Sequence, residues 1–94
     1  MKIRVEFFGV PRSRAGCAEA EIDLEGEPTL GRLLAAVAAR YPDLAAECLQ
    51  GAGADCRLID SYVCNLDGEQ FVHDPATTIR AGQAVMILAA DAGG

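Results

Sequence analysis

The hydrophobic pattern of this chain has a helical period in one long segment only, and strand-like segments lie on both sides of it. Between Thr29 and Pro42 the apolar residues recur at the spacing of one face of an α-helix, at Leu30, Leu33, Leu34, Val37, Ala38 and Tyr41. The other patterned segments alternate apolar and polar residues or form short apolar runs, as strands do. One amphipathic helix among several strands predicts an α+β fold in which the helix covers a sheet.

Two strands open the chain. Residues Lys2–Phe8 alternate charged and apolar side chains, and the alternation resumes from Ala18 to Leu24, which is the period of half-buried strands. Between these segments the pattern is broken by Gly9, Pro11, Ser13 and Gly16. We therefore predict an N-terminal hairpin whose strands are joined by a loop.

The helix has recognisable ends. Thr29 is a favoured N-cap residue, and Pro42 stops the helix. Asp43 can cap a further short helical turn, which the glycines of residues 51–53 end. We predict a loop from Gln50 to Asp60.

The remaining strands follow this loop. Ser61–Leu66 and Glu69–Val72 flank Asp67-Gly68, a residue pair that favours a type I′ turn and a two-residue hairpin. Ala84–Ala90 is almost wholly apolar, which is typical of a strand in the middle of a sheet. Three strands are therefore expected after the helix.

The order strand, strand, helix, strand, strand, strand suits the β-grasp, or ubiquitin-like, fold, with a mixed sheet of about five strands packed on one main helix. The first and last strands would lie side by side and parallel, because the helical crossover between them permits that pairing. We predict one domain over residues 1–90 and a short flexible tail over residues 91–94, which leaves the sheet at its rim.

Size and charge exclude several classes of function. A chain of 94 residues has room for one core, and little room for the cleft of roughly 300 Å³ that a self-sufficient enzyme uses. The formal net charge of −6 would repel nucleic acid, and the acids of residues 19–27 fit the solvated face of a strand better than a docking patch.

The longest apolar runs, Leu33–Ala39 and Ala84–Ala90, are too short for a membrane span, and the N-terminus lacks a signal-peptide pattern. We expect a cytoplasmic protein.

The thiols, the histidine and two arginines are weak site candidates. The cysteines form no CxxC pair, so we predict no metal site, and without an export signal we expect reduced thiols at Cys17, Cys48, Cys56 and Cys64. We interpret Cys64 as a core residue and His73 as an exposed turn residue. Arg12 and Arg14 could contact a partner or a nucleotide phosphate, but we favour simple solvation of a loop.

The four residues after Ala90 end in Gly93 and Gly94, which have no side chain to anchor them. Extended, four residues reach on the order of 13 Å, enough to place a terminal carboxylate in a pocket of another protein. Such a carboxylate is ionised at neutral pH, with a pKa of roughly 3.3 to 3.7, and resists nucleophilic attack. It would have to be activated, for example as an acyl-adenylate, before a sulphur nucleophile could be attached.

Five segments of the chain resemble the MoaD/ThiS family of ubiquitin-like sulphur carriers. They are Val5–Gly16, with its aromatic pair and Arg-containing turn, Thr29–Pro42, Tyr62–Asn65, Ile79–Val85 and Ala92–Gly94. The segment Asp43–Asp60 makes the chain similar to the longer members, and Ala89-Ala90-Asp91 stands where many relatives have prolines and an apolar residue.

The resemblance implies that Gly94 carries the adenylate and then a thiocarboxylate, with Gly93 as its steric partner and Asp91 and Ala92 as partner contacts. The implied partners are an E1-like adenylating enzyme, a sulphur-donor protein and a sulphur-accepting synthase. ATP and the sulphur donor would be used by the activating partner, and no cofactor would be bound permanently. We expect no catalytic site of its own, so the chain would act as a protein co-substrate or a small subunit.

The leading pathway is molybdopterin biosynthesis, in which the chain would be the small subunit of molybdopterin synthase, in complex with a large subunit. The alternatives are a sulphur carrier for cysteine, thiamin or specialised-metabolite biosynthesis, and a ubiquitin-like protein modifier. A β-grasp interaction module in which the tail plays no part is a further alternative.

Overall fold

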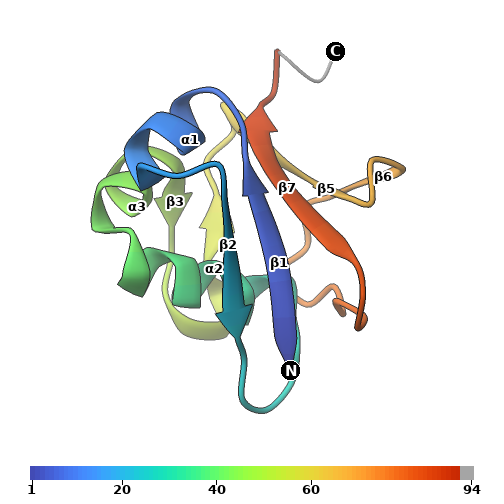
Figure 1. The fold of residues 1–94 in the computed structure, drawn as a ribbon. Helices are drawn as coiled ribbons and strands as arrows, with labels where there is room; N and C mark the ends of the chain where they lie inside the picture. The colour runs from blue at the N-terminus through green and yellow to red at the C-terminus, as the bar shows by residue number, and fades with distance from the viewer. Residues whose placement is uncertain (92–94) are drawn as a thin grey trace.

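The computed structural model describes residues 1–91 as an α+β domain whose five-stranded mixed sheet is covered on one face by helices (Figure 1). The strand order across the sheet is β2-β1-β7-β5-β6. The elements of this sheet and its main helix are β1 (Lys2–Phe7), β2 (Glu19–Asp23), α2 (Leu30–Arg40), β5 (Tyr62–Leu66), β6 (Gln70–Val72) and β7 (Ala84–Ala89). The predicted fold class, a β-grasp sheet packed on one main helix, is confirmed.

The last strand occupies the middle of the sheet. β7 runs parallel to β1, with Val5 opposite Val85, and antiparallel to β5, with Cys64 opposite Ile87. Val85 and Ile87 are fully buried, as a strand covered by a helix layer on one face and flanked on both edges requires. The predicted parallel pairing of the first and last strands is therefore confirmed.

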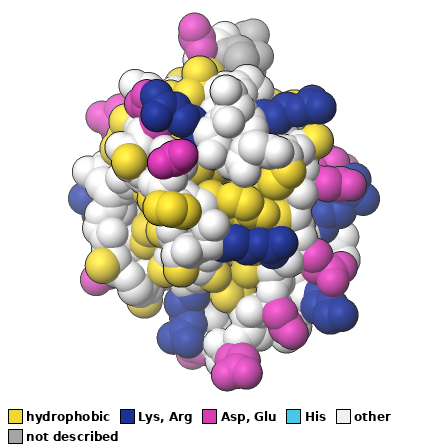
Figure 2. Space-filling view, turned by 60° about the vertical axis from the view of Figure 1, so that its left-hand side comes forward, with side chains coloured by type: hydrophobic (Ala, Val, Ile, Leu, Met, Phe, Trp, Pro, Cys, Tyr) yellow, Lys and Arg dark blue, Asp and Glu magenta, His cyan; other side chains and the backbone are white. Residues whose placement is uncertain are grey.

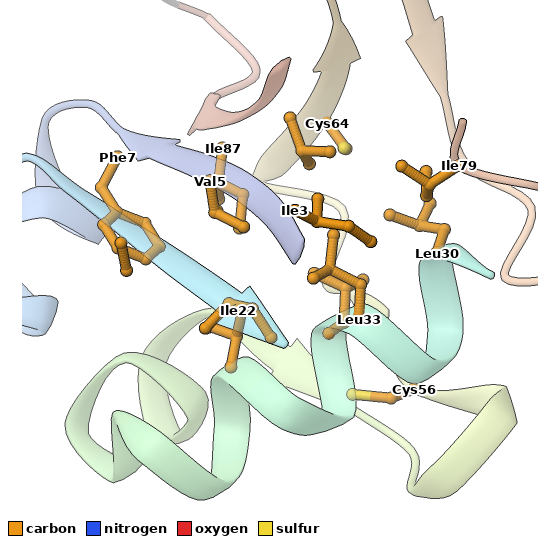
Figure 3. Close-up of a cluster of buried hydrophobic side chains, with 14 of the residues drawn as sticks. Ile3, Val5, Phe7, Ile22, Leu30, Leu33, Cys56, Cys64, Ile79 and Ile87 are labelled. Atoms are coloured by element: carbon orange, nitrogen blue, oxygen red, sulfur yellow. The ribbon is translucent and has the colours of Figure 1, made fainter. Parts of the chain in front are cut away.

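The helix-facing side of the sheet and the apolar stripe of α2 form one core (Figure 3). The stripe consists of Leu30, Leu33, Leu34 and Val37, and it packs on alternate residues of the strands, among them Ile3, Val5, Phe7, Ile22 and Ile87. Thr29 caps the helix as predicted, because its hydroxyl Oγ1 accepts a hydrogen bond from the Arg32 amide at 3.3 Å.

The connection between β1 and β2 is a helix, α1 (Val10–Ala15), and not the loop expected from the sequence. Pro11 lies at its start, where the missing N–H costs no intrahelical bond. Gly16 ends it in the left-handed conformation and donates its N–H to the Arg12 carbonyl. Three of the four residues interpreted as pattern breakers, Gly9, Pro11 and Gly16, therefore lie at the ends of a short helix.

A second short helix, α3 (Pro42–Cys48), follows α2 directly. Pro42 thus both ends one helix and begins the next. The N-cap of α3 is Tyr41, which makes no side-chain cap hydrogen bond, and Asp43 lies inside the first turn. The prediction of a short helix here is confirmed. The assignment of Asp43 as its cap is wrong, and so is the expected end at residues 51–53, because the helix ends at Cys48 and a strand follows it.

The segment predicted as a loop from Gln50 to Asp60 contains regular structure. β3 (Leu49–Gln50) pairs with β4 (Arg57–Leu58), and the 3₁₀ turn η1 (Gly53–Asp55) joins them. This turn packs on the start of α2 so closely that a Cβ at Gly31 would overlap the Ala54 carbonyl. Two-residue strands carry too little periodic pattern to be found from a sequence.

The β5–β6 hairpin has the predicted turn with a slightly longer connection. Asp67 and Gly68 have φ values of 59° and 73°, as a type I′ turn requires, and the Glu69 amide donates to the Leu66 carbonyl at 3.0 Å. The first pair beyond the turn is Leu66 and Gln70, so Glu69 belongs to the connection.

Within residues 1–91, none of the helices has the length and apolar character needed to cross a membrane.

Candidate functional site

The first candidate site is the end of β7, where the chain leaves the sheet. Asp91 is exposed and lies in a turn directly after the strand. Ala92, Gly93 and Gly94, which the sequence analysis assigned to partner contact and thiocarboxylate formation, lie outside the described residues. The structure therefore defines the base from which these residues extend, and the assignment of Gly94 and Gly93 stays a prediction.

This base is held firmly by backbone hydrogen bonds. The Ala90 amide donates to the Ser61 carbonyl at 2.9 Å, and the Phe8 amide donates to the Ile87 carbonyl at 3.0 Å. Ala89, the last residue of β7, lies opposite Tyr62 of β5. The direction in which the chain leaves the domain is thus set by the two strands that flank β7.

The surroundings of this base include α1, which lies at the same end of the molecule as the end of β7 (Figure 1). A shallow hollow of about 390 Å³ adjoins it, lined by Val10, Ser61, Tyr62 and residues 89–91. Arg14 of α1 forms an ion pair with Glu47 of α3, 3.3 Å between Nη2 and Oε1, and Arg12 is exposed. Both arginines are on a helix rather than in the predicted loop.

The second candidate site is the face of the sheet opposite α2, which carries no helix. Its β1–β2 half is charged. Arg4 lies between two carboxylates, 2.9 Å from Glu6 and 3.0 Å from Glu19, and Lys2 lies 3.6 Å from Glu21. The hydrogen bond with Glu6 and the nearby charge of Glu19 raise the pKa of Arg4. These exposed pairs contribute little to stability, and they leave this half with more carboxylates than cations.

The β7–β5–β6 half of the same face is apolar. Phe8 and Phe71 are 41% and 48% exposed, and with Met86 and Leu88 they surround a hollow of about 220 Å³. Large apolar side chains that share one open patch are a frequent mark of a protein interaction site. We call these four residues, together with Asn65, the apolar patch.

Asn65 lies at the centre of the apolar patch. Its neighbours across the two adjoining strands are Phe71 on β6 and Met86 on β7. The residue is 7% exposed, and within the described chain its Oδ1 is buried without a hydrogen-bond partner. A buried polar atom without a partner destabilises the free protein by about 1 to 3 kcal/mol, so its presence calls for an explanation.

The thiols do not form a nucleophilic site. All four cysteines are free, and burial raises the pKa values of Cys48, Cys56 and Cys64, the last to about 12. A thiol with so high a pKa is protonated at neutral pH and unreactive. The interpretation of Cys64 as a core residue is confirmed, since it is fully buried. Cys17, which is partly exposed, donates to the Tyr41 hydroxyl at 3.6 Å.

His73 is exposed directly after β6, as predicted. Within residues 1–91, no three His, Cys, Asp or Glu side chains are placed to hold a metal ion together. The helix-covered side of the molecule shows acidic and basic side chains interspersed around exposed apolar atoms, with no broad basic surface (Figure 2). This face therefore does not present the basic stripe that a nucleic-acid backbone needs.

The sequence analysis did not identify the apolar patch. The apolar run of β7 indicates a central strand, but it does not show whether both faces of that strand are covered. Met86 and Leu88 of β7 are only partly buried, because no helix lies over them. The cross-strand register that brings Asn65 and Phe71 beside them depends on tertiary pairing, which no local pattern reveals.

Comparison with protein-family models gives one match, to the ThiS family, and it spans residues 5–94. No curated protein matches the chain. Among solved structures, SAMP1 from Haloferax volcanii superposes with a TM-score of 0.80 at 19% identity, covering 100% of each chain.

Two further solved structures are similar. A putative molybdopterin converting factor, subunit 1, from Pyrococcus furiosus has a TM-score of 0.71 at 22% identity, over 95% of this chain and 97% of that chain. The BexX/CysO complex of Amycolatopsis orientalis contains a chain with a TM-score of 0.68 at 19% identity, over 98% of this chain and 99% of that chain. At these identities the likeness shows a common fold.

Proposed function

Because this chain belongs to the ThiS family of small ubiquitin-like proteins, we propose that it is a sulphur carrier whose Gly94 carboxylate is adenylated and then converted to a thiocarboxylate. The thiocarboxylate would donate sulphur in the biosynthesis of a cofactor or metabolite. Gly93 would allow the chain to pass through a channel too narrow for a Cβ, and Asp91 and Ala92 would contact the partner.

The placement of β7 is the observation that supports this proposal best. The strand is clamped between β1 and β5 along its length and ends at Ala89, so the residues after it start from a fixed point at the rim of the sheet. The family match continues past this point to residue 94. To deliver a reactive carboxylate into another protein, the chain needs a fixed starting point and a few residues beyond it, and the end of β7 provides this starting point.

The chemistry is assigned to the partners. An adenylating enzyme would let the Gly94 carboxylate attack the α-phosphorus of ATP, with loss of pyrophosphate, and a sulphur nucleophile would then displace AMP from the acyl-adenylate. Within the described residues, no three His, Cys, Asp or Glu side chains are placed together to hold a metal ion, and the exposed His73 directly follows β6. What residues 1–91 supply is a binding surface, and the apolar patch is the part of that surface best suited to a partner.

Within this function, we propose molybdopterin biosynthesis as the leading pathway, with the chain as the small subunit of a molybdopterin synthase. The similarity to the Pyrococcus furiosus protein, whose name refers to molybdopterin conversion, supports this choice. A carrier for cysteine, thiamin or specialised-metabolite biosynthesis is the nearest alternative, since CysO belongs to another of the similar structures.

Intact-mass analysis tests the carrier function. The purified protein is incubated with the E1-like adenylating enzyme of the same organism, ATP and a sulphur donor. We expect the mass gain that corresponds to one oxygen replaced by one sulphur, localised to the C-terminal peptide by fragmentation. A protein whose mass stays unchanged while the enzyme adenylates a known carrier in parallel would contradict the proposal.

A second candidate function is protein modification, in which Gly94 is joined to lysines of other proteins. It is favoured by the similarity to small archaeal modifier protein 1, with TM-scores of 0.80 and 0.73 for the chains from two archaea. Activation would proceed in the same way, and only the acceptor would differ. Lysine-linked adducts in cell extract would support the modifier, whereas a free protein bearing a thiocarboxylate would support the carrier.

A further inference from the structure

The partnerless oxygen of Asn65 is the feature of this molecule that the fold itself does not explain. A leucine of similar size would fill the same position on the open face without leaving a polar atom unbonded. The residues opposite it, Phe71 and Met86, offer no side-chain donor. In the free protein, the unpaired Asn65 Oδ1 therefore lowers the unfolding free energy, and no hydrogen bond within residues 1–91 offsets this loss.

A hydrogen-bond donor on another protein would satisfy this oxygen and so stabilise the complex. Asn65 Oδ1 can accept from an N–H group of a partner, and once the partner covers the patch and excludes water, that hydrogen bond is stronger than one formed in water. The two side chains across from Asn65, Phe71 and Met86, can adjust to a partner. Phe71 is 48% exposed, and Met86 is unbranched and adapts its shape readily.

The charges around the patch restrict the identity of the partner. Glu6 of β1 lies opposite Met86 at the boundary between the charged and apolar halves, and the β1–β2 half carries Glu19 and Glu21 as well. A complementary surface would be apolar at its centre and basic at its rim. A second copy of this chain, with its own net charge of −6, would be repelled.

The position of the patch relates it to the chemistry of the proposed function. Leu88 of β7 belongs to the patch, and Ala89 and Ala90 follow it directly toward residues 91–94. A protein that takes the C-terminal residues into its own site is therefore well placed to cover the same face. The adenylating enzyme is the partner that the carrier and the modifier functions both require.

We propose that Asn65 is a specificity-determining residue for the adenylating enzyme, whose apolar, basic-rimmed surface covers the apolar patch and donates one N–H to Asn65 Oδ1. This inference rests on the proposed function. It predicts that substitution of Asn65 weakens binding of the adenylating enzyme without lowering the stability of the free domain. Substitution of a residue that serves folding would have the opposite effects.

The test compares Asn65→Leu with Gln50→Leu, which makes the same exchange of an amide for an apolar side chain at an exposed position on β3, outside the apolar patch. The dissociation constant for the adenylating enzyme is measured by titration calorimetry, and the KM for the carrier is measured by ATP–pyrophosphate exchange. For Asn65→Leu we expect both to rise by about fivefold to tenfold, the effect of one lost hydrogen bond, with an unchanged or raised melting temperature. For Gln50→Leu we expect values close to wild type.

A measurement on the wild-type protein guards against misfolding of the variant. In ¹⁵N-labelled protein, the side-chain amide resonances of Asn65 should shift on addition of the adenylating enzyme without ATP, whereas those of Gln50 on β3, distant from the patch, should not. Unshifted Asn65 resonances in a formed complex would overturn the inference.

The outcomes separate the inference from the function on which it rests. If the wild-type protein is adenylated and Asn65→Leu is bound and adenylated equally well, the inference alone fails. If the wild-type protein is not adenylated, the proposed function fails and the inference with it. A lower melting temperature for Asn65→Leu with unchanged binding would show that Asn65 serves the fold.

Discussion

Arg40 donates a hydrogen bond from Nη1 to the backbone carbonyl of Glu21 at 2.9 Å. The guanidinium also lies over the Tyr41 ring, 5.4 Å from the ring centroid, which holds it in place. Glu21 belongs to β2, an edge strand of the sheet. The last residue of α2 therefore occupies a backbone group that would otherwise be free to pair with a strand of another molecule.

Replacement of Arg40 tests this protection. For Arg40→Ala we expect a loss of about 1 kcal/mol in unfolding free energy, from one hydrogen bond and the contact with Tyr41, and a greater tendency to self-associate through β2. Urea denaturation and sedimentation velocity measure the two effects. Arg80→Ala, at an exposed site after the core residue Ile79, is the control. A variant as stable and monomeric as wild type would show that Arg40 does not guard the edge.

The contact between Gly31 and Ala54 gives a prediction whose sign opposes helix propensity. In an unconstrained helix, Gly→Ala stabilises by about 1 kcal/mol. At Gly31, a Cβ would overlap the Ala54 carbonyl and meet Pro75, so we expect Gly31→Ala to lower the unfolding free energy by about 1 to 3 kcal/mol. Thermal and urea unfolding measure it, and an increase in stability would contradict the close packing of η1 on α2.

The apolar patch predicts a variant that separates folding from partner binding. Phe71 is 48% exposed, so Phe71→Ser should change the melting temperature little. Because exposed aromatic residues often dominate binding energy, we expect its thiocarboxylate formation by the adenylating enzyme to slow by about tenfold at low carrier concentration. Lys2→Ala, on the charged half of the same face, is the matched control. Equal rates for Phe71→Ser and wild type would exclude the patch from docking.

Cys64 predicts a loss of stability in alkaline solution. Burial raises its pKa from 9.0 to about 12, so between these values the unfolded chain releases a proton that the folded chain keeps. The stability linked to this thiol is complete below pH 9 and falls as the pH rises toward 12. In Cys64→Ala the cavity lowers stability at every pH, but the decrease between pH 8 and pH 11 should be shallower than in wild type. Parallel slopes would contradict this assignment.

Sequence reasoning found the parts of the fold that have a long period or a specific turn chemistry. The stripe of α2, the Thr29 cap, the Asp67-Gly68 turn and the central position of β7 all follow from patterns within about a dozen residues. It missed α1 because Pro11 and Gly16 occur both in loops and at helix ends. It missed β3, β4 and η1 because they are too short to carry a period.

The candidate site also has a part that the sequence could predict and a part that it could not. The assignment of Gly93 and Gly94 to thiocarboxylate formation comes from the sequence, because it depends on composition and on a family resemblance, and it stays a prediction. The apolar patch could not be predicted, because its residues meet only through register and topology: Asn65, Phe71, Met86 and Leu88 come from three strands, and Phe8 directly follows β1. That Asn65 lacks a hydrogen-bond partner is likewise a property of the assembled sheet.

The central claim is that the Gly94 carboxylate is adenylated and converted to a thiocarboxylate. One paired measurement tests this claim most directly. The full chain and a chain ending at Ala92 are each incubated with the adenylating enzyme, ATP and a sulphur donor, and their intact masses are recorded beside their circular dichroism spectra and melting temperatures. We expect identical folds and melting temperatures, with the gain of one sulphur for one oxygen in the full chain alone. If the shortened chain gains the same mass, or if the full chain gains none from an enzyme proven active, the account is contradicted.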